Sequence, residues 1–305
     1  MRSGKSSLER VNLLDCRRCS VPRPRKQFGQ HWLRSEKALG RIVAAADLQK
    51  PDDQGCGGDR VLEIGPGTGI LTRQLLAKAA TVVAVEVDRD LCQSLTQKFG
   101  KADNFLLLQG DFLALDLPAL LTPFPPFQQP NKVVANIPYN ITGPILEKLL
   151  GTIGSPNIDT FEAIVLLVQR EVALRLKANP GSRHFGALSV RVQYLADCEF
   201  VCDVPASAFY PPPKVDSAVI CLRPRAIAIP AEQPKRLEQL IRLGFSSKRK
   251  MLRNNLQSII EREQLNQVLE ELNINPQARA EDLSVQQWVQ FSNRLGRDRN
   301  ANDTV

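Results

Sequence analysis

The chain has 305 residues, of which 43% are hydrophobic, enough for a large α/β core and a smaller companion domain. Its formal net charge of +8 favours a polyanionic partner over a neutral small substrate. No apolar run approaches the roughly twenty residues that span a bilayer, and the N-terminus lacks the apolar core of a signal peptide. We therefore expect a cytoplasmic protein that does not enter the membrane.

The N-terminal segment carries much of the excess charge, because residues 1–26 hold eight basic residues against only Glu9 and Asp15. We expect residues 1–24 to be a disordered tail with a general attraction to phosphate, although an organelle transit peptide is an alternative. Cys16 and Cys19 form an isolated C-x-x-C pair, and a zinc site needs a second ligand pair, so we expect no metal site.

Apolar runs alternate with amphipathic stretches from about residue 34 to 225, which is the pattern of a parallel sheet wrapped by helices. A first helix is expected at 35–47, with Ser35 as its N-cap. Residues 52–58 and the Pro-rich segments 121–130 and 205–214 are predicted to be loops. The expected strands are apolar throughout and should be buried on both faces: 60–64, 81–87, 105–109, 132–136 and 163–168.

The last strands and the C-terminal region follow a different pattern. Segments 190–204 and 217–223 are predicted to form a closing β-hairpin with a long connection. Beyond Pro234 the pattern is wholly helical, with candidates at 235–245, 248–260, 263–272 and 284–295. We therefore expect an α/β domain over residues 25–228 and a helical domain over 229–305.

A glycine turn follows the first predicted strand and precedes the helical segment LTRQLLAK. Gly65, Gly67 and Gly69 allow the backbone to turn sharply and a ligand to approach closely. Glu86 ends the next strand, where a carboxylate accepts both hydroxyls of a ribose. Asp111 follows the third strand, placed to accept from an adenine amino group, with Phe112 beside the ring. Together these residues predict a nucleoside cofactor at one edge of the sheet.

Two other interpretations of this pattern stay open at this point. Glu86 and Asp111 could be merely polar strand ends. A nicotinamide dehydrogenase is disfavoured, because the spacing is Gly-x-Gly-x-Gly and no partner for hydride transfer follows.

The fourth strand ends in Asn136-Ile137-Pro138-Tyr139, a motif suited to an adenine amine. That nitrogen is a poor nucleophile because its lone pair is delocalised into the ring. The Asn136 side-chain oxygen and a backbone carbonyl aimed by Pro138 can accept its hydrogens, more strongly as charge builds during attack. Tyr139 can stack on the flipped base, and Phe209 is a second platform candidate, with a core position as its alternative. For the motif as a whole, the alternative is a simple strand-terminating turn.

The segment RLGFSSKRKMLR at 242–253 contains five basic residues and no acid. Such a run is usually a solvated face, but Leu252 and Leu256 add packing anchors at helical spacing. We therefore expect Lys248, Arg249 and Lys250 to position the protein on RNA phosphates.

These motifs closely resemble those of the KsgA family, the 16S rRNA adenine N6-dimethyltransferases, from about Arg25 to Leu295. The shared segments are RKQFGQHWL at 25–33, EIGPGTG at 63–69, EVDRDL at 86–91, QGDF at 109–112, NIPYNIT at 136–142, QREVALRL at 169–176, FGALSV at 185–190, PPPKVDSAV at 211–219 and KRKMLRNNL at 248–256. The resemblance implies a class I, Rossmann-like methyltransferase fold, with a mostly parallel seven-stranded sheet and a small all-α C-terminal domain.

The resemblance also implies a cofactor, a substrate and site residues. S-adenosylmethionine would be bound by the glycine turn, including Gly65 and Gly67, and by His31, Leu33, Glu86, Asp111 and Asn136. The substrate would be two adjacent adenosines in a hairpin loop near the 3′ end of 16S rRNA, each methylated twice. The expected partner is the pre-30S small ribosomal subunit, and the enzyme would act as a monomer.

One departure from the family pattern affects the cofactor site. The first motif usually reads FGQNFL, and here His31 and Trp32 replace Asn and Phe. A neutral histidine offers one N–H donor but cannot reproduce the donor and acceptor pair of an amide.

Two rival functions remain. The 23S rRNA dimethyltransferases that confer erythromycin resistance share the cofactor and NIPY-type motifs, although KRKMLRNNL and the C-terminal PQARAEDLSVQQW segment favour the 16S enzyme. The second rival is an RNA-binding assembly factor whose methylation is incidental.

Overall fold

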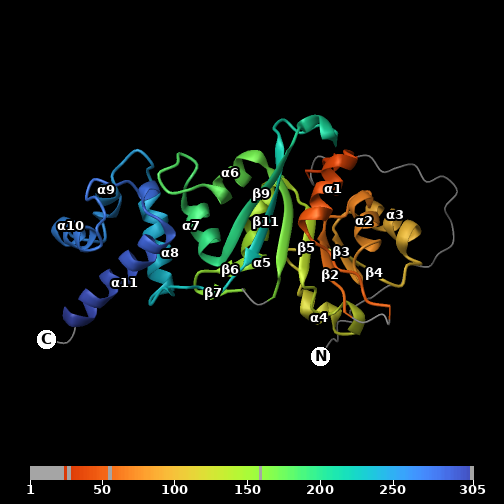
Figure 1. The fold of residues 1–305 in the computed structure, drawn as a ribbon, viewed down its shortest axis with the longest axis horizontal. Coiled ribbons are helices and arrows are strands. Elements are labelled where there is room, and N and C mark those ends of the chain that lie inside the picture. Colours follow the sequence, from red (N-terminus) through yellow and green to blue (C-terminus); the bar gives the residue numbers. More distant parts are fainter. Residues whose placement is uncertain (1–23, 26–28, 54–56, 158–159, 303–305) are drawn as a thin grey trace, which may run out of the picture.

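The computed structural model describes residues 24–25, 29–53, 57–157 and 160–302. Within them, a twisted sheet lies between two layers of helices, and a group of four helices extends from one side (Figure 1). The tail with Cys16 and Cys19 lies outside the described residues, so its predicted disorder and lack of zinc are untested. Among the helices that the structure describes, none combines the length and apolarity needed to cross a bilayer.

The central sheet has seven strands in the spatial order β4-β3-β2-β5-β8-β11-β9. Six strands run in the same direction, and β11 alone in this sheet runs antiparallel to its neighbours β8 and β9. The strands are β2 (Arg60–Ile64), β3 (Thr81–Glu86), β4 (Phe105–Gln109), β5 (Lys132–Asn136), β8 (Ala163–Gln169), β9 (Ala196–Val204) and β11 (Ser217–Pro224). The mostly parallel seven-stranded fold expected from the sequence is thus confirmed.

Helices cover both faces of the sheet. Buried residues of α1 (Glu36–Ala45) and α2 (Ile70–Leu76) pack on one face, and those of α5 (Thr142–Leu150), α6 (Arg170–Lys177) and α7 (Ala187–Leu195) pack on the other. In β8, residues alternate between the two cores, which explains why its sequence reads as a continuous apolar run.

The remaining elements are short or lie at the edges. Helix α3 (Arg89–Phe99) follows β3, and α4 (Leu117–Leu121) follows β4. Two small antiparallel pairs complete this part: β1 (Trp32–Leu33) with β10 (Phe209–Tyr210), and β6 (Gly151–Thr152) with β7 (Ser155–Pro156). Ser35 caps α1 as expected, because its side chain accepts a hydrogen bond from the Ala38 N–H.

The predicted strand at 190–204 was wrong over its first six residues. Residues up to Leu195 belong to α7, and the strand begins at Ala196. The alternating segment VRVQY imitates a strand, but α7 is buried on several sides, so its apolar residues do not follow an amphipathic helical pattern. Ser189 stabilises the helix start, because its hydroxyl accepts from the Gly186 N–H and donates to the Arg175 carbonyl.

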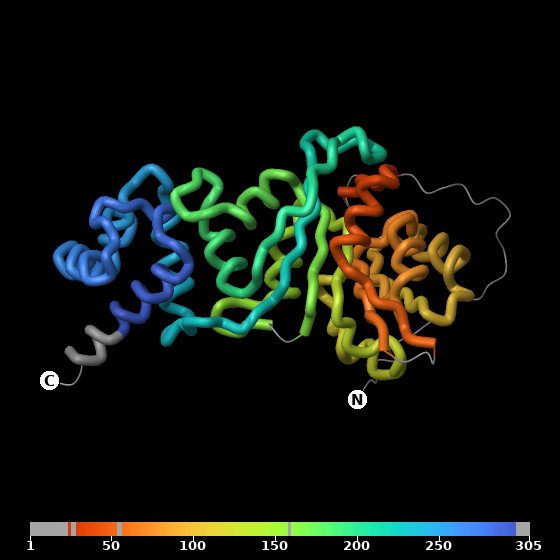
Figure 2. Tube along the Cα trace, viewed as in Figure 1, coloured from red at the N-terminus to blue at the C-terminus, as the bar shows by residue number. Residues whose placement is uncertain are grey.

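The C-terminal helices are α8 (Pro234–Gly244), α9 (Leu252–Leu256), α10 (Arg262–Glu271) and α11 (Val285–Asn302). They gather around fully buried side chains, including Trp288 and Phe291, and this core continues into the one beneath the sheet. Figure 2 shows the corresponding end of the chain as a separate lobe beside α7. The division between residues 228 and 229 stays a prediction.

The predicted helix at 248–260 was also wrong, because only Leu252–Leu256 is α-helical. Residues between α8 and α9 form a turn that a buried side chain of α9 holds in place. Asn255 Nδ2 donates to the carbonyls of Gly244 and Ser247. The Leu252 N–H donates to the Ala278 carbonyl and not to a residue of the preceding turn, so the helix does not extend to earlier residues.

Candidate active site

The carboxyl ends of four parallel strands meet at one pocket. Gly65 follows β2, Glu86 ends β3, Asp111 follows β4 and Asn136 ends β5, and all four line the same cavity. The opposite wall comes from residues 29–32, which precede α1. The structure therefore brings together the cofactor and amine-binding residues that the sequence assigned to one edge of the sheet.

The three glycines of the turn share a backbone conformation, but Gly65 and Gly69 have different roles. All have positive φ angles, +67° at Gly65, +59° at Gly67 and +81° at Gly69. At Gly65 a Cβ would meet no atom nearer than the Asn136 carbonyl oxygen at 4.0 Å, whereas at Gly69 it would lie 2.5 Å from the Phe99 ring. Gly65 thus leaves open space for a ligand, and Gly69 permits close packing of α3 against the turn.

Glu86 is a buried carboxylate directed at the glycine turn. Its Oε2 accepts from the Gly67 N–H at 3.1 Å, and its Oε1 accepts from the Asp88 N–H at 2.9 Å. Burial raises the pKa of Glu86, and these two N–H groups oppose that effect by stabilising the ionised form. Each oxygen keeps a second lone pair, so the carboxylate can still accept two ligand hydroxyls.

The loop after β4 presents Asp111 beside a fixed aromatic ring. Asp111 is exposed, and its Oδ1 accepts from the Leu113 N–H. Phe112 is buried, and the Lys148 ammonium lies 5.0 Å from its ring centre. Lys148 also donates to the carbonyls of Phe112 and Leu115, so α5 holds this loop in place. Lys148 was not among the predicted site residues, because a lone lysine in an amphipathic helix carries no signal of such a role.

The NIPY segment places Asn136 with its amide oriented. Asn136 Nδ2 donates to the His31 carbonyl at 3.1 Å, and no described residue donates to its Oδ1. Tyr139 lies beside it in a short 3₁₀ turn, with its hydroxyl bonded to Ser217. Burial raises the pKa of Tyr139, so this side chain stays neutral at physiological pH. Because Asn136 Nδ2 makes the contact to the His31 carbonyl, the amide oxygen of Asn136 is left as a hydrogen-bond acceptor in the pocket.

His31 lines the pocket in a defined tautomer. Its Nδ1 lies 2.8 Å from the Pro211 carbonyl, and since a carbonyl only accepts, Nδ1 carries the proton. The donor that we expected a neutral His31 to offer the cofactor is therefore used within the protein, and Nε2 is an acceptor. The ring is stacked on Tyr139, with 6.0 Å between centroids and 17° between planes.

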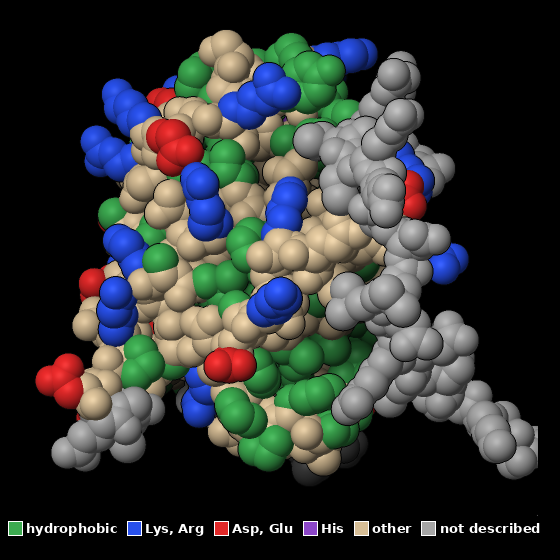
Figure 3. Space-filling view, turned by 90° about the vertical axis from the view of Figure 1, so that its right-hand side faces the viewer, with side chains coloured by type: hydrophobic (Ala, Val, Ile, Leu, Met, Phe, Trp, Pro, Cys, Tyr) green, Lys and Arg blue, Asp and Glu red, His purple; other side chains and the backbone are tan. Residues whose placement is uncertain are grey.

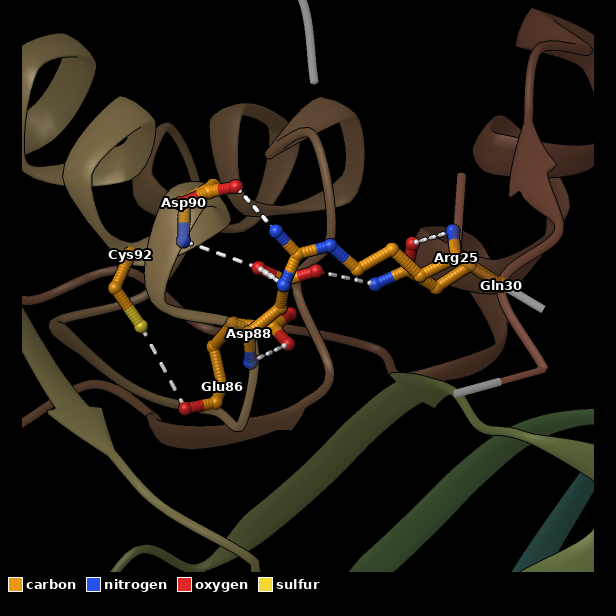
Figure 4. Close-up of polar contacts among 6 residues, drawn as sticks. All are labelled: Arg25, Gln30, Glu86, Asp88, Asp90 and Cys92. Atoms are coloured by element: carbon orange, nitrogen blue, oxygen red, sulfur yellow. Dashed lines mark hydrogen bonds and ion pairs between the residues drawn. The ribbon is translucent and has the colours of Figure 1, made fainter. Parts of the chain in front are cut away.

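Charged contacts hold the segment before His31 against the corner between β3 and α3 (Figure 4). Asp88, which is 2% exposed, caps α3 and also receives contacts from Gln30 at 3.1 Å and Arg25 at 3.3 Å. Arg25 pairs with Asp90 as well. The sequence analysis did not give these residues a role, although EVDRDL contains both aspartates. They position the wall that carries His31.

Two further polar groups lie beneath the glycine turn. Glu63 is 1% exposed, and burial raises its pKa to about 8. Its Oε2 and the Trp32 Nε1 have no hydrogen-bond partner among the described residues, and both side chains line a cavity of about 30 Å³. This volume is sufficient for one water molecule. The acid inside the otherwise apolar strand RVLEI was a signal that the sequence analysis did not use.

The remaining sequence candidates lie outside the pocket. Leu33 is 3% exposed and does not line it. Phe209 is 4% exposed and packs in the core, whereas the next residue, Tyr210, is 46% exposed. The structure supports the core alternative for Phe209, because its side chain is directed away from solvent.

The basic residues before α9 lie in the helical lobe, away from the strands that form the pocket (Figure 1). Lys248 donates to the carbonyls of Arg183 and Phe185, so it links this lobe to the loop before α7. Arg249 and Lys250 are exposed. Within the part of the chain that the structure describes, no group of three or more His, Cys, Asp or Glu side chains is placed to hold a metal.

Residues 22–297 match the family described as ribosomal RNA adenine dimethylase. Similar curated proteins include the ribosomal RNA small subunit methyltransferase A of Nostoc sp. (strain PCC 7120), 69% identical over 90% of this chain and 98% of the relative. The protein of the same name from Rippkaea orientalis is 59% identical, with the same shares covered.

Two solved structures share the architecture along most of their length. A dimethyladenosine transferase from Plasmodium falciparum has a TM-score of 0.72 and 26% identity, covering 88% of this chain and 98% of that one. The 23S rRNA methyltransferase ErmE has a TM-score of 0.65 and 29% identity, covering 87% and 99%. Because the family match extends over most of the sequence, the chain belongs to the ribosomal RNA adenine dimethylase family.

Proposed function

We propose that this S-adenosylmethionine-dependent rRNA adenine dimethyltransferase acts on two adjacent adenosines in the 3′-terminal hairpin loop of 16S rRNA. Its substrate particle is the assembling small subunit, the pre-30S particle, and it acts in the cytoplasm as a monomer. The observation that carries the proposal is the single pocket in which the glycine turn and Glu86 adjoin Asn136. A site for a nucleoside cofactor and a site for an amine thus share one cavity.

The residues of the pocket fit S-adenosylmethionine, which supplies an activated methyl group on its sulfonium when bound. Glu86 would accept from the ribose hydroxyls, and Asp111 would accept from the adenine amino group of the cofactor. The open space at Gly65 lets the backbone approach such a ligand without a side chain intervening.

On the substrate side, Asn136 Oδ1 and a main-chain carbonyl of residues 136–138 would hold the hydrogens of adenosine N6. This contact directs the nitrogen lone pair toward the methyl carbon. Positive charge would build on the nitrogen as it takes the methyl group, and the two acceptors would stabilise it more than they stabilise the ground state. The nitrogen then loses a proton to water, and the product is a neutral amine.

The choice of 16S rRNA over 23S rRNA rests on the relatives. Those at 59% and 69% identity carry the small-subunit name, whereas ErmE, a 23S enzyme, is 29% identical. The exposed Arg249 and Lys250 in the segment KRKMLRNNL support docking on a large RNA particle. An intact set of strand-end residues argues against a protein that only binds RNA.

The proposal is tested by incubating undermethylated small subunits, and separately large subunits, with purified protein and S-adenosylmethionine. Mass spectrometry of the digested rRNA should show N6,N6-dimethyladenosine at two adjacent positions of 16S rRNA and none in 23S rRNA. Modification confined to 23S rRNA would favour the resistance-type enzyme. Tight subunit binding without any methylation would favour an assembly factor.

A further inference from the structure

A second groove adjoins the methyl-transfer pocket, with a volume of about 660 Å³. Trp32 lines both cavities, so the two share a wall. The groove is lined by three cationic side chains, Arg34, Arg73 and Lys98. It is also lined by three aromatic side chains, Trp32, Phe99 and Tyr210. No Asp or Glu belongs to its described lining.

The pairing of β1 with β10 explains the aromatic wall of the groove. Trp32 lies opposite Tyr210 in this ladder, and Leu33 lies opposite Phe209. Because successive side chains of a strand point to opposite faces, the second pair is buried in the core while the first pair shares the other face. Two short strands therefore place an indole and a phenol ring on the same face of the ladder.

Arg34 turns this wall into a stacking platform. Its guanidinium lies 4.1 Å from the Tyr210 ring centre, and its backbone N–H donates to the Ala208 carbonyl. The platform is open to a ligand, since Arg34 is exposed and Tyr210 is 46% exposed. Guanidinium planes and aromatic rings are the surfaces on which proteins stack unpaired bases.

The other two cations of the groove, Arg73 and Lys98, come from two helices that flank the glycine turn. Arg73 of α2 pairs with Glu36 at 3.6 Å, and both side chains are about two-thirds exposed, so this ion pair is weak. Lys98 of α3 donates to the Thr68 carbonyl, which ties it to the turn. Figure 3 shows this end of the molecule, where Lys and Arg side chains outnumber acidic ones.

We propose that the groove binds the nucleotide next to the target adenosine in the rRNA loop. Its base stacks on the Arg34–Tyr210 platform, and Arg73 neutralises its phosphate. The inference rests on the proposed function, because a base drawn into the pocket leaves its chain neighbour unstacked. Aromatic rings interleaved with cations are typical of sites for single-stranded RNA, whereas a free anion would not use the rings.

The groove therefore gives the enzyme a second contact on a substrate that contains two adjacent adenosines. While one adenosine lies in the pocket, the other is the neighbour that occupies the platform. Loss of the platform should weaken RNA recognition and leave the chemical step nearly unchanged, because the groove does not contact the reacting nitrogen.

The test compares Tyr210→Ala, Tyr210→Phe and Arg73→Ala with wild type, and with Arg191→Ala, an exposed arginine of α7 outside the groove. Steady-state rates are measured on small subunits with saturating cofactor, alongside calorimetric affinity for S-adenosylmethionine and thermal unfolding. We expect Tyr210→Ala to raise the KM for subunits roughly ten-fold with kcat within about two-fold, since stacking contributes that much per base. Tyr210→Phe should retain the wild-type KM.

Arg73→Ala should reduce the salt dependence of subunit binding by a slope of about 1, the value for one phosphate contact, and Arg191→Ala should not. An unchanged KM in Tyr210→Ala would overturn the inference, as would an equal loss of cofactor affinity in Tyr210→Ala with folding intact. The proposed function fails separately, if the wild-type protein leaves 16S rRNA unmethylated. Wild-type methylation with an unaltered Tyr210→Ala KM would reject only the groove.

Discussion

At the scale of single residues, the Asn136 amide has two contacts with different functions. Its Nδ2 donates to the His31 carbonyl, and its Oδ1 is left for the substrate amine. We predict that Asn136→Ala lowers kcat by about 10²–10³, the effect of removing one preorganised group that stabilises developing charge. Single-turnover methylation of small subunits measures this, with subunit binding by filtration as the control. Turnover within a few-fold of wild type would exclude the assigned role.

Glu63 gives a second prediction, for stability against pH. Its pKa is raised to about 8 by burial, so the folded protein keeps this carboxyl protonated at pH values where the unfolded chain ionises it. Folding then takes up a proton, and stability falls as pH rises from about 4.5 to 8. Glu63→Gln mimics the protonated acid and should lose this dependence. The free energy of unfolding of the variant, relative to that of wild type, should therefore increase across that window.

Urea unfolding at several pH values measures the difference, with the exposed Glu261→Gln as the matched control. The slope for one group is at most about 1.4 kcal/mol per pH unit. Parallel pH profiles for wild type and Glu63→Gln would mean that Glu63 is ionised in the folded protein.

The sequence predicted those site residues that follow the ends of long strands. Gly65, Glu86 and Asn136 are such residues, because parallel strands bring their carboxyl ends to a common edge. It did not predict which aromatic of Phe209 and Tyr210 faces outward. That choice depends on the pairing of two-residue strands far apart in the chain, and a shift of one residue would exchange the two faces.

At the scale of elements, the turn between α8 and α9 depends on one buried amide. We predict that Asn255→Ala destabilises the protein by about 1–3 kcal/mol, because the Gly244 and Ser247 carbonyls lose their donor. Chemical denaturation measures the change. The neighbouring Asn254 is exposed, so Asn254→Ala should stay within about 0.5 kcal/mol of wild type. Equal effects of the two substitutions would contradict this account of the turn.

Elements were predicted well where burial is simple. The ranges of β2, β4 and β5 agree with the expected strands. β2 and β5 are buried on both faces, whereas β4 lies at the edge of the sheet and is only half-buried, so the prediction of full burial was wrong for 105–109. The start of α7 and the turn before α9 were predicted wrongly for a shared reason, because tertiary contacts determine the secondary structure of both segments. α7 is enclosed by neighbouring helices, and the turn is held by Asn255 from later in the chain.

At the scale of the whole molecule, RNA docking is expected to involve both the pocket and the helical lobe. Arg249 and Lys250 are exposed, whereas Lys248 holds backbone carbonyls of the loop before α7. We predict that the double variant Arg249→Ala/Lys250→Ala weakens subunit binding and lowers its salt slope by about 2, one for each lost phosphate contact. Binding of S-adenosylmethionine should not change.

Subunit affinity measured at several salt concentrations tests this prediction. Arg262→Ala, an exposed residue of the same lobe, serves as the control. A salt slope equal to that of wild type would place the RNA contact elsewhere on the surface.

The global architecture followed from the sequence because alternating strands and helices leave few topologies. The boundary between the sheet and the helical lobe did not follow as clearly. Buried residues form one continuous cluster from beneath the sheet, through α7, to Trp288. A cluster built from segments distant in the chain leaves no composition change at the boundary.

The central claim is that one pocket binds S-adenosylmethionine beside the NIPY segment. Calorimetric titration of the folded protein with this cofactor tests it most directly, with Glu86→Ala as the matched variant. We predict saturable one-to-one binding in the wild type and at least ten-fold weaker binding in Glu86→Ala, because the ribose loses a charged acceptor. Absence of binding to folded wild-type protein, or equal affinity in the variant, would contradict the account.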